Sequence, residues 1–217
     1  MSAKDRIIAR IRAAHARQGE PSPVVRSAVR RYVSQHPQGP RPRSDWDPLA
    51  RFRERALSLA STVEVVAGIQ DLPRAAAQYL DANGLPRQAV CWPELAALPW
   101  REHGLDVEAR PARGEDLVGI TGAFCAIAET GTLVLASGAD TPAAASLLPE
   151  THIAVLRAAS IVRGMEDAWA LLRAELGEMP RALNLVSGPS RTADIEQTIN
   201  LGAHGPYRVH VVILAGA

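Results

Sequence analysis

The segment 119–132 places a single carboxylate, that of Glu129, among small and apolar residues. Desolvation in such surroundings raises the pKa of a carboxyl group, as an acid–base or nucleophilic role requires. Hydroxyl groups and glycine N–H groups nearby are suited to holding an anionic substrate or an oxyanion. The predicted donors are Thr121, Gly122, Thr130 and Gly131. We therefore predict Glu129 as a catalytic residue; the alternative is a hairpin turn whose polar tip faces water.

A second candidate is the sequence SGPSRTAD at residues 187–194, which follows a predicted strand and opens a predicted helix. The first turn of a helix presents free N–H groups and the positive end of the helix dipole, which together bind anions. Arg191 adds a guanidinium that can grip a carboxylate or phosphate through two hydrogen bonds. The predicted ligand-binding residues here are Ser187, Gly188, Ser190, Arg191 and Thr192. Ordinary helix capping by Thr192 or Asp194 is the alternative, and it is compatible with anion binding.

His204 stands on a constrained turn, in the sequence GAHGP at residues 202–206. An imidazole at such a place is suited to act as a general base or to anchor a ligand, and we predict His204 as a second catalytic residue. A turn histidine that faces solvent is the alternative. His152 is placed to pair with Glu129 or His204, although a structural histidine is the more common case.

The usage of cysteine, lysine and glycine argues against several cofactor sites. The chain has two cysteines, Cys91 and Cys125, and no C-x-x-C pair, whereas an iron–sulfur cluster or a structural zinc usually takes four ligands. The only lysine is Lys4, so a phosphate-binding loop of the G-x-x-x-x-G-K-[ST] type is excluded. No G-x-G-x-x-G motif indicates a dinucleotide site. We expect this chain to bind no metal and no cofactor of its own.

The first 60 residues are predicted to form a basic, helical N-terminal arm. Helices are predicted at 4–18 and 24–34, and a third, capped by Asp45 or Asp47, ends near Leu59. Residues 1–55 contain 13 basic and 5 acidic residues, a net charge of +8. The remaining residues contain 11 basic and 18 acidic residues, a net charge of −7. We expect the arm to lie on its own body or on an acidic partner. Binding to nucleic acid is disfavoured, because no binding motif accompanies the charge.

Residues 61–217 alternate predicted strands with predicted helices. The strands are predicted at 62–66, 88–92, 106–110, 117–128, 132–136, 152–156, 182–186 and 209–214, and the helices at 71–82, 165–176 and 192–200. This order predicts an α/β domain with a mostly parallel, mixed sheet covered by helices on both faces. The tight turn at 129–131 predicts one antiparallel hairpin inside that sheet.

The chain contains no segment of the kind that enters a membrane. No apolar run reaches the roughly 18 residues needed to cross a bilayer. The first residues open into a charged helix pattern and lack a secretory apolar region. We expect a cytoplasmic protein without a membrane span.

Taken in order, the motifs resemble the LUD domain of the lactate-utilization protein C family. The strings that carry the resemblance, over roughly residues 60–214, are VGITGA (118–123), IAETGTLVL (127–135), LPETHIAV (148–155), SGPSRTADIE (187–196) and GAHGP (202–206). The resemblance implies a fold similar to that of the sugar-phosphate isomerase and CoA-transferase-like superfamily. It also implies a non-redox role beside iron–sulfur partner proteins in the oxidation of L-lactate to pyruvate.

Two functions remain open at the level of the sequence. In the first, the chain is a component of a lactate-oxidising system, binds a small anionic ligand, and leaves the iron–sulfur clusters to its partners. In the second, it is a free-standing CoA-transferase-like or sugar-phosphate isomerase-like enzyme. Glu129 is then the candidate nucleophile by analogy of fold.

Overall fold

The computed structural model describes residues 2–14, 20–192, 200–202 and 204–216, and the chain divides into two compact units between Pro42 and Arg43. The first unit holds two of the predicted helices, α1 (Ala3–Ala14) and α2 (Pro23–Gln35). No residue of either helix is buried. Ser22 caps α2 by accepting a hydrogen bond from a backbone N–H of its first turn, and Pro23 opens the helix.

The third predicted helix, α3 (Pro48–Ser58), lies in the second unit. Asp47, one of the two predicted caps, accepts a backbone hydrogen bond of the first turn. Phe52 and Ala56 are 0% and 1% exposed. Because these side chains belong to the core of the second unit, the boundary falls before α3 and not at the predicted residue 60.

The second unit is built on a six-stranded sheet in which all neighbouring strands are parallel. Its strands, in spatial order, are β1 (Thr62–Val66), β12 (Arg208–Leu214), β7 (Thr151–Arg157), β4 (Val118–Gly122), β2 (Gln88–Cys91) and β3 (Asp106–Ala109). Parallel alignment gathers the carboxyl ends of all six strands at one edge, called here the carboxyl edge. This sheet confirms the predicted α/β class.

The predicted hairpin forms a second, mixed sheet and not part of the first. The strands of this sheet, in spatial order, are β8 (Ile161–Val162), β5 (Cys125–Ile127), β6 (Thr132–Ala136) and β9 (Leu183–Val186). The strands β5 and β6 pair antiparallel, as predicted. The prediction of one long strand at 117–128 was wrong, because the chain leaves the first sheet after Gly122 and enters the second at Cys125.

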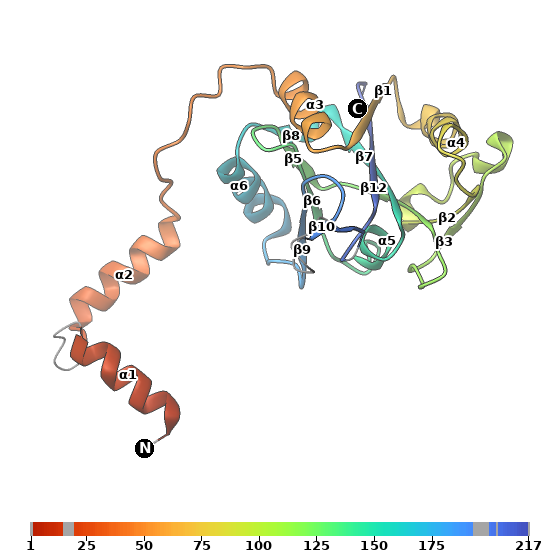
Figure 1. Cartoon of the computed structure of the whole chain (residues 1–217). Coiled ribbons are helices and arrows are strands. Elements are labelled where there is room, and N and C mark those ends of the chain that lie inside the picture. The colour runs from red at the N-terminus through yellow and green to blue at the C-terminus, as the bar shows by residue number, and fades with distance from the viewer. Residues whose placement is uncertain (1, 15–19, 193–199, 203, 217) are drawn as a thin grey trace. The chain divides into compact units, whose positions relative to one another are not determined.

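Four layers stack in the second unit (Figure 1). Helix α4 (Leu72–Ala82) covers one face of the six-stranded sheet. The other face packs mainly against the four-stranded sheet, together with α3 and α5 (Ala144–Leu147), so helices cover it only in part. Helix α6 (Met165–Leu176) covers the outer face of the four-stranded sheet. The alternation of strand side chains explains this order: Ala126 and Leu133 face the larger sheet, whereas Ile127 and Val134 face α6.

Short elements complete the chain. The 3-10 helices are η1 (Ile69–Asp71), η2 (Pro93–Leu95), η3 (Trp100–His103) and η4 (Ala158–Ser160). A two-stranded ribbon pairs β10 (Arg191–Thr192) antiparallel with β11 (Asn200–Leu201). The prediction of a helix at 192–200 was wrong at both ends, because residues 192 and 200 pair with each other in β10 and β11. Residues 193–199 lie outside the described residues. No helix in the described ranges is long and apolar enough to cross a membrane.

Gly119 packs directly against α5. The carbonyl oxygen of Ala145 occupies the place that a Cβ of residue 119 would take, and Pro149 Cγ lies 2.9 Å from that position. Only a residue without a side chain allows this distance between β4 and α5. Gly119 is therefore a point of close approach between the backbones of β4 and α5.

We expect Gly119→Ala to lower the free energy of unfolding by about 2–3 kcal/mol, because the added methyl group displaces the backbone of α5. Urea unfolding followed by circular dichroism measures the change. Gly114→Ala is the matched control, since nothing lies within 4 Å of a Cβ at that position. Equal unfolding free energies for the two variants would contradict the close contact.

Two histidines lie in the six-stranded sheet, on opposite faces. His152 is 0% exposed, and its Nε2 lies 2.8 Å from the Thr121 hydroxyl, which itself donates to the Gly122 carbonyl. His210 is 4% exposed, bonds the Thr62 hydroxyl through Nδ1 and stacks on Tyr79 with ring centroids 4.0 Å apart. Burial lowers the pKa of each imidazole to about 4. Both histidines are therefore neutral in the folded protein at neutral pH.

The buried histidines predict a loss of stability in acid. Since their folded pKa of about 4 lies below the ordinary value of 6.5, the unfolded chain binds more protons between these two pH values. We expect the free energy of unfolding to be highest above pH 6.5 and to fall towards pH 4, by up to about 3 kcal/mol for each histidine. Thermal unfolding across this range measures it.

The variant His210→Phe keeps the stack on Tyr79 and removes one titrating group, so its pH dependence should be flatter than that of the unaltered protein. His36→Gln, at an exposed position of the first unit, should leave the slope unchanged. An unaltered slope in His210→Phe would show that His210 is not the source of the acid sensitivity.

Candidate functional site

Three predicted motifs meet beside the C-terminal end of α3. The Thr132 hydroxyl lies 2.7 Å from the hydroxyls of both Thr130 and Ser187, which joins the Glu129 turn to the second motif. Ser190 N donates to Pro206 O at 2.9 Å, and Ser190 O accepts from Gly202 N at 3.0 Å. These bonds join the second motif to the His204 turn. The motif cluster is defined here as residues 129–132, 187–191, 202 and 204–206.

The Glu129 turn is held from two sides. Gly131 N donates to Ile127 O at 2.9 Å, and Glu129 N donates to Arg163 O at 3.0 Å. Gly131 has a φ of +69°, and a Cβ there would lie 2.7 Å from the backbone nitrogen of Ala56 on α3. The turn therefore needs glycine both for its conformation and for contact with the helix.

The three hydroxyls lead from the core to the surface of the second unit. Thr132 is 3% exposed, Thr130 is partly buried and Ser187 is exposed. A hydroxyl both donates and accepts, so the chain of bonds can reorient when a ligand contacts its outer end. This arrangement gives the motif cluster polar groups that are aligned without being fixed in one direction.

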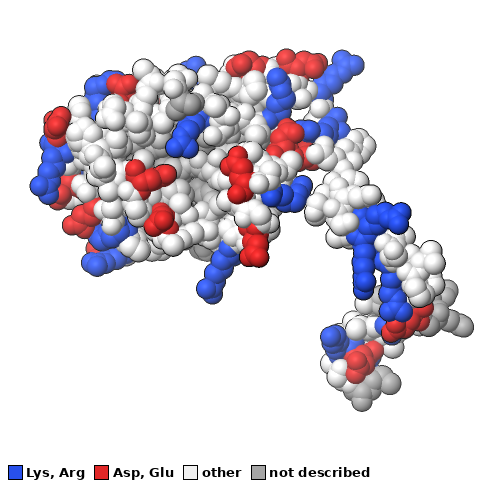
Figure 2. Space-filling model, turned by 180° about the vertical axis from the view of Figure 1, so that it is seen from behind, with Lys and Arg blue, Asp and Glu red and all other residues white. Residues whose placement is uncertain are grey.

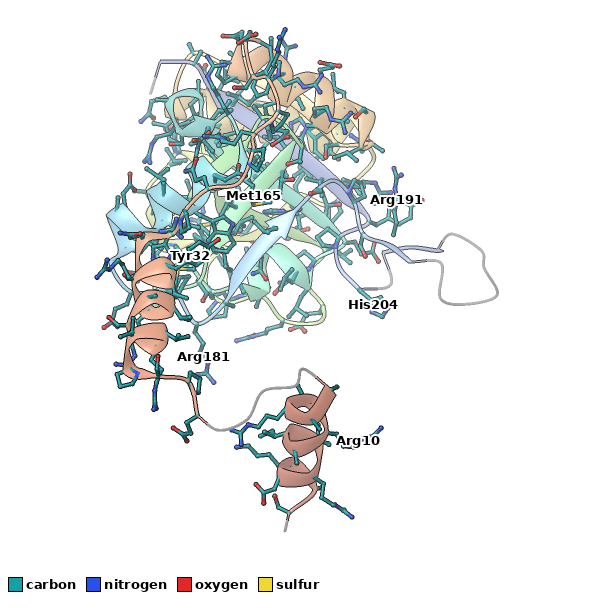
Figure 3. The ribbon with its side chains drawn as sticks, turned by 90° about the vertical axis from the view of Figure 1, so that its left-hand side faces the viewer. Arg10, Tyr32, Met165, Arg181, Arg191 and His204 are labelled. Atoms are coloured by element: carbon teal, nitrogen blue, oxygen red, sulfur yellow. The ribbon has the colours of Figure 1, made fainter. Side chains whose placement is uncertain are left out.

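Two arginines approach the motif cluster. Arg191 is exposed, and its hydrogen bond to the Leu59 carbonyl is long at 3.4 Å. Arg191 and His204 both extend from the segments around β10 and β11 (Figure 3). Arg55 lies on α3 with its Cβ 2.8 Å from the Cβ position of Gly131, and its Nε is buried without a hydrogen-bond partner. With Glu129 as the only carboxylate of the cluster, the site carries a cationic excess suited to an anion.

Several predicted residues lie elsewhere. Thr121 is fully buried, and His152, predicted beside Glu129 or His204, bonds Thr121 instead. Gly122 lines a different cavity. The backbone of Thr192 belongs to β10, while Asp194 and Ala203 lie outside the described residues.

The ligand-binding roles of the remaining residues, and the catalytic roles of Glu129 and His204, stay predictions. Glu129 is partly exposed and His204 exposed. Sequence reasoning missed Arg55, because the helical pattern assigned α3 to the arm. No local signal pairs Arg55 with Gly131, since their contact depends on how α3 packs.

A separate cavity of about 830 Å³, called here the carboxyl-edge cavity, opens at the ends of β4, β7 and β12. Its apolar lining includes Ile69, Trp92, Leu95, Phe124, Leu171 and Leu176. Its charged lining residues are Arg157, Glu94, Glu175 and Glu178. Ligands of open α/β sheets commonly bind at this edge. The negative excess, however, suits a cationic or apolar partner better than a small anion.

The described residues contain no group of three or more His, Cys, Asp or Glu side chains placed to hold a metal ion. Cys91 and Cys125 are both buried, in different parts of the core. Burial raises the pKa of Cys91 to about 11. Burial, and to a lesser degree the charge of Glu175, raises that of Cys125 to about 12.

The chain is similar to a known family and to several known proteins. The model of the LUD domain matches residues 98–214. Lactate utilization protein C of Deinococcus radiodurans is 34% identical over 182 residues, which cover 81% of this chain and 83% of that protein. Lactate utilization protein C of Bacillus subtilis is 34% identical over 128 residues, 57% of this chain and 53% of that protein. The chain thus spans about half the length of the Bacillus relatives it matches.

Among solved structures, the crystal structure of a DUF162 family protein from Deinococcus radiodurans is similar, with a TM-score of 0.62 and 28% sequence identity. The match covers 80% of this chain and 100% of that one. The family model spans more than half of the chain, and the Deinococcus relative is matched over most of its length. The chain therefore belongs to the LUD-domain family, which includes the lactate utilization protein C relatives.

Proposed function

We propose that this chain is a non-redox component of lactate utilization that binds a small carboxylate or phosphate ligand at the motif cluster. In this proposal, iron–sulfur partner proteins oxidise L-lactate to pyruvate. The observation that carries the role is the match over 83% of the Deinococcus radiodurans protein named lactate utilization protein C. The cationic excess at the motif cluster supports the ligand class.

The state of the cysteines supports leaving electron transfer to partners. A thiol has to lose its proton to bind iron or to react as a nucleophile. With pKa values raised to about 11 and about 12, Cys91 and Cys125 are neutral thiols near neutral pH. The proposal therefore places the clusters on the partners, and the protein would act in the cytoplasm, where lactate is consumed.

Charge favours the motif cluster over the carboxyl-edge cavity as the site of an anion. At the motif cluster, Arg55 and Arg191 stand against Glu129, and hydroxyls offer further donors. In the carboxyl-edge cavity, the single guanidinium of Arg157 stands against three carboxylates. The cavity is also much larger than a three-carbon acid requires. A monoanion such as lactate is therefore favoured at the motif cluster.

The alternative is a free-standing enzyme that uses Glu129 on a thioester or a sugar phosphate. Glu129 is absent from the lining of the carboxyl-edge cavity, so a large substrate held in that cavity would not be placed against its carboxylate. This geometry favours the binding component over the enzyme. Assays of the purified chain with acyl-CoA and sugar phosphates test the alternative; turnover that Glu129→Gln abolishes would establish it.

Binding of L-lactate, pyruvate and inorganic phosphate to the purified chain tests the proposed site. We expect Arg191→Leu and Arg55→Leu each to weaken binding about tenfold or more, because each removes a charged hydrogen-bond donor. Isothermal titration calorimetry measures the dissociation constants. Arg53→Leu, on an exposed position of the same helix as Arg55, should bind as the unaltered chain does. If only Arg157→Leu weakened binding, the anion would bind in the carboxyl-edge cavity and not at the motif cluster.

Growth of a strain lacking this gene, with L-lactate as the sole carbon source, tests the role. We expect no growth without the gene, restored growth with the unaltered gene or the Arg53→Leu variant, and poor growth with Arg191→Leu. Chain isolated from lactate-grown cells should bring with it proteins that contain iron and acid-labile sulfide. Normal growth of the deletion strain would end the proposal.

A further inference from the structure

Helix α2 of the first unit carries an apolar stripe that the described residues of its own unit leave uncovered. The stripe consists of Val25, Val29, Tyr32 and Val33, at helical spacings of four, three and one, with exposures of 52%, 57%, 66% and 61%. Arg30 and Arg31 accompany it, and neither side chain has a hydrogen bond or ion pair to another described residue. A helix with an apolar stripe usually buries it against another surface.

The two units carry opposite charge. Residues 1–42 contain nine basic and two acidic residues, a net of +7, whereas residues 43–217 contain 15 and 21, a net of −6. Blue arginine side chains crowd the helices of the first unit in Figure 2, and Arg10 extends away from α1 in Figure 3. The surface that complements the first unit is therefore acidic. The second unit, with its net charge of −6, carries such a surface.

The carboxyl-edge cavity matches α2 in size and chemistry. Its volume of about 830 Å³ holds several side chains, and its walls combine apolar side chains with carboxylates. Glu175 and Glu178 line it at the end of α6, where the helix dipole adds negative potential. Leu176 and Met179, between and beside these carboxylates, are 37% and 52% exposed. The valine and tyrosine side chains of α2 can pack against the apolar walls, while its arginines form ion pairs with the carboxylates.

The segment between the units points to a second copy as the carrier of this surface. The Ser44 and Trp46 carbonyls accept hydrogen bonds from Arg163, which fixes the start of the second unit. Between α2 and Ser44 the chain contains prolines at 37, 40 and 42. Proline-rich segments are extended, semi-rigid spacers, a form suited to presenting α2 to a second copy.

We propose that α2 of one copy binds in the carboxyl-edge cavity of a second copy, and that the exchange is mutual. A mutual exchange closes into a symmetric dimer with two identical contacts. Each contact buries the stripe of α2 and places Arg30 and Arg31 against Glu175 and Glu178. The contact is independent of the anion site at the motif cluster, so either is testable without the other.

Analytical ultracentrifugation of the full chain, at low and high salt, tests the dimer. We expect a dimer whose dissociation constant rises with salt and rises at least about tenfold in R30E/R31E and in E175R/E178R. Combining the four substitutions in one chain should restore association, because the charges are exchanged. The control R53E/R101E makes the same charge change at exposed positions outside both surfaces and should remain dimeric.

Three results would overturn the proposal. A full chain that is monomeric at every micromolar concentration means that α2 has no partner copy, whether or not it folds onto its own body. A dimer that persists in R30E/R31E and E175R/E178R means that other surfaces hold it. A monomer that sediments with phosphatidylserine vesicles, but not with neutral ones, means that the stripe binds lipid.

Discussion

The C-terminal end of α3 packs on two glycines, and the motif cluster depends on that contact. Gly131 and Gly188 both have a positive φ, and in each the missing Cβ makes room for the backbone of α3 or of Leu59. The two glycines come from different motifs, so one helix end fixes the Glu129 turn against the segment that carries Ser187. Any shift of α3 would separate Arg55, Thr130 and Ser187 together. The rigidity of this site is therefore set by backbone packing more than by its side-chain hydrogen bonds.

Local pattern was sufficient for most elements of the fold. The strand at 62–66 and the helix at 165–176 have the predicted bounds, because alternation and helical spacing of apolar residues specify them within a few residues. The sheet to which a strand belongs is a long-range property. The stretch 117–128 is small or apolar except for Thr121, so its pattern could not show that the chain changes sheets at Ala123 and Phe124. Residue 192 follows a strand, as a helix start would, but pairs with residue 200.

The site was predictable as motifs and not as contacts. The sequence identified the Thr130, Ser187 and His204 segments separately, and the structure joins them through Thr132, Ser190 and Gly202. Thr121 lies apart from the motif cluster, which its sequence could not show, since a threonine in a glycine-rich strand looks the same whether it faces a ligand or a buried imidazole. The carboxyl-edge cavity was not predicted, because its lining comes from loops and helices far apart in sequence.

The motif cluster and the carboxyl-edge cavity carry opposite charge, so a ligand that suits one of them is repelled by the other. The chain has a net charge of +1, which is the sum of +7 on the first unit and −6 on the second. Within the second unit, the cationic excess lies at the motif cluster and the anionic excess at the carboxyl-edge cavity. A small monoanion is repelled from the cavity and attracted to the cluster, and a basic helix experiences the reverse. In our proposals, the negative charge of the carboxyl-edge cavity attracts α2. The positive charge of the motif cluster repels α2 from the place where the small carboxylate ligand binds.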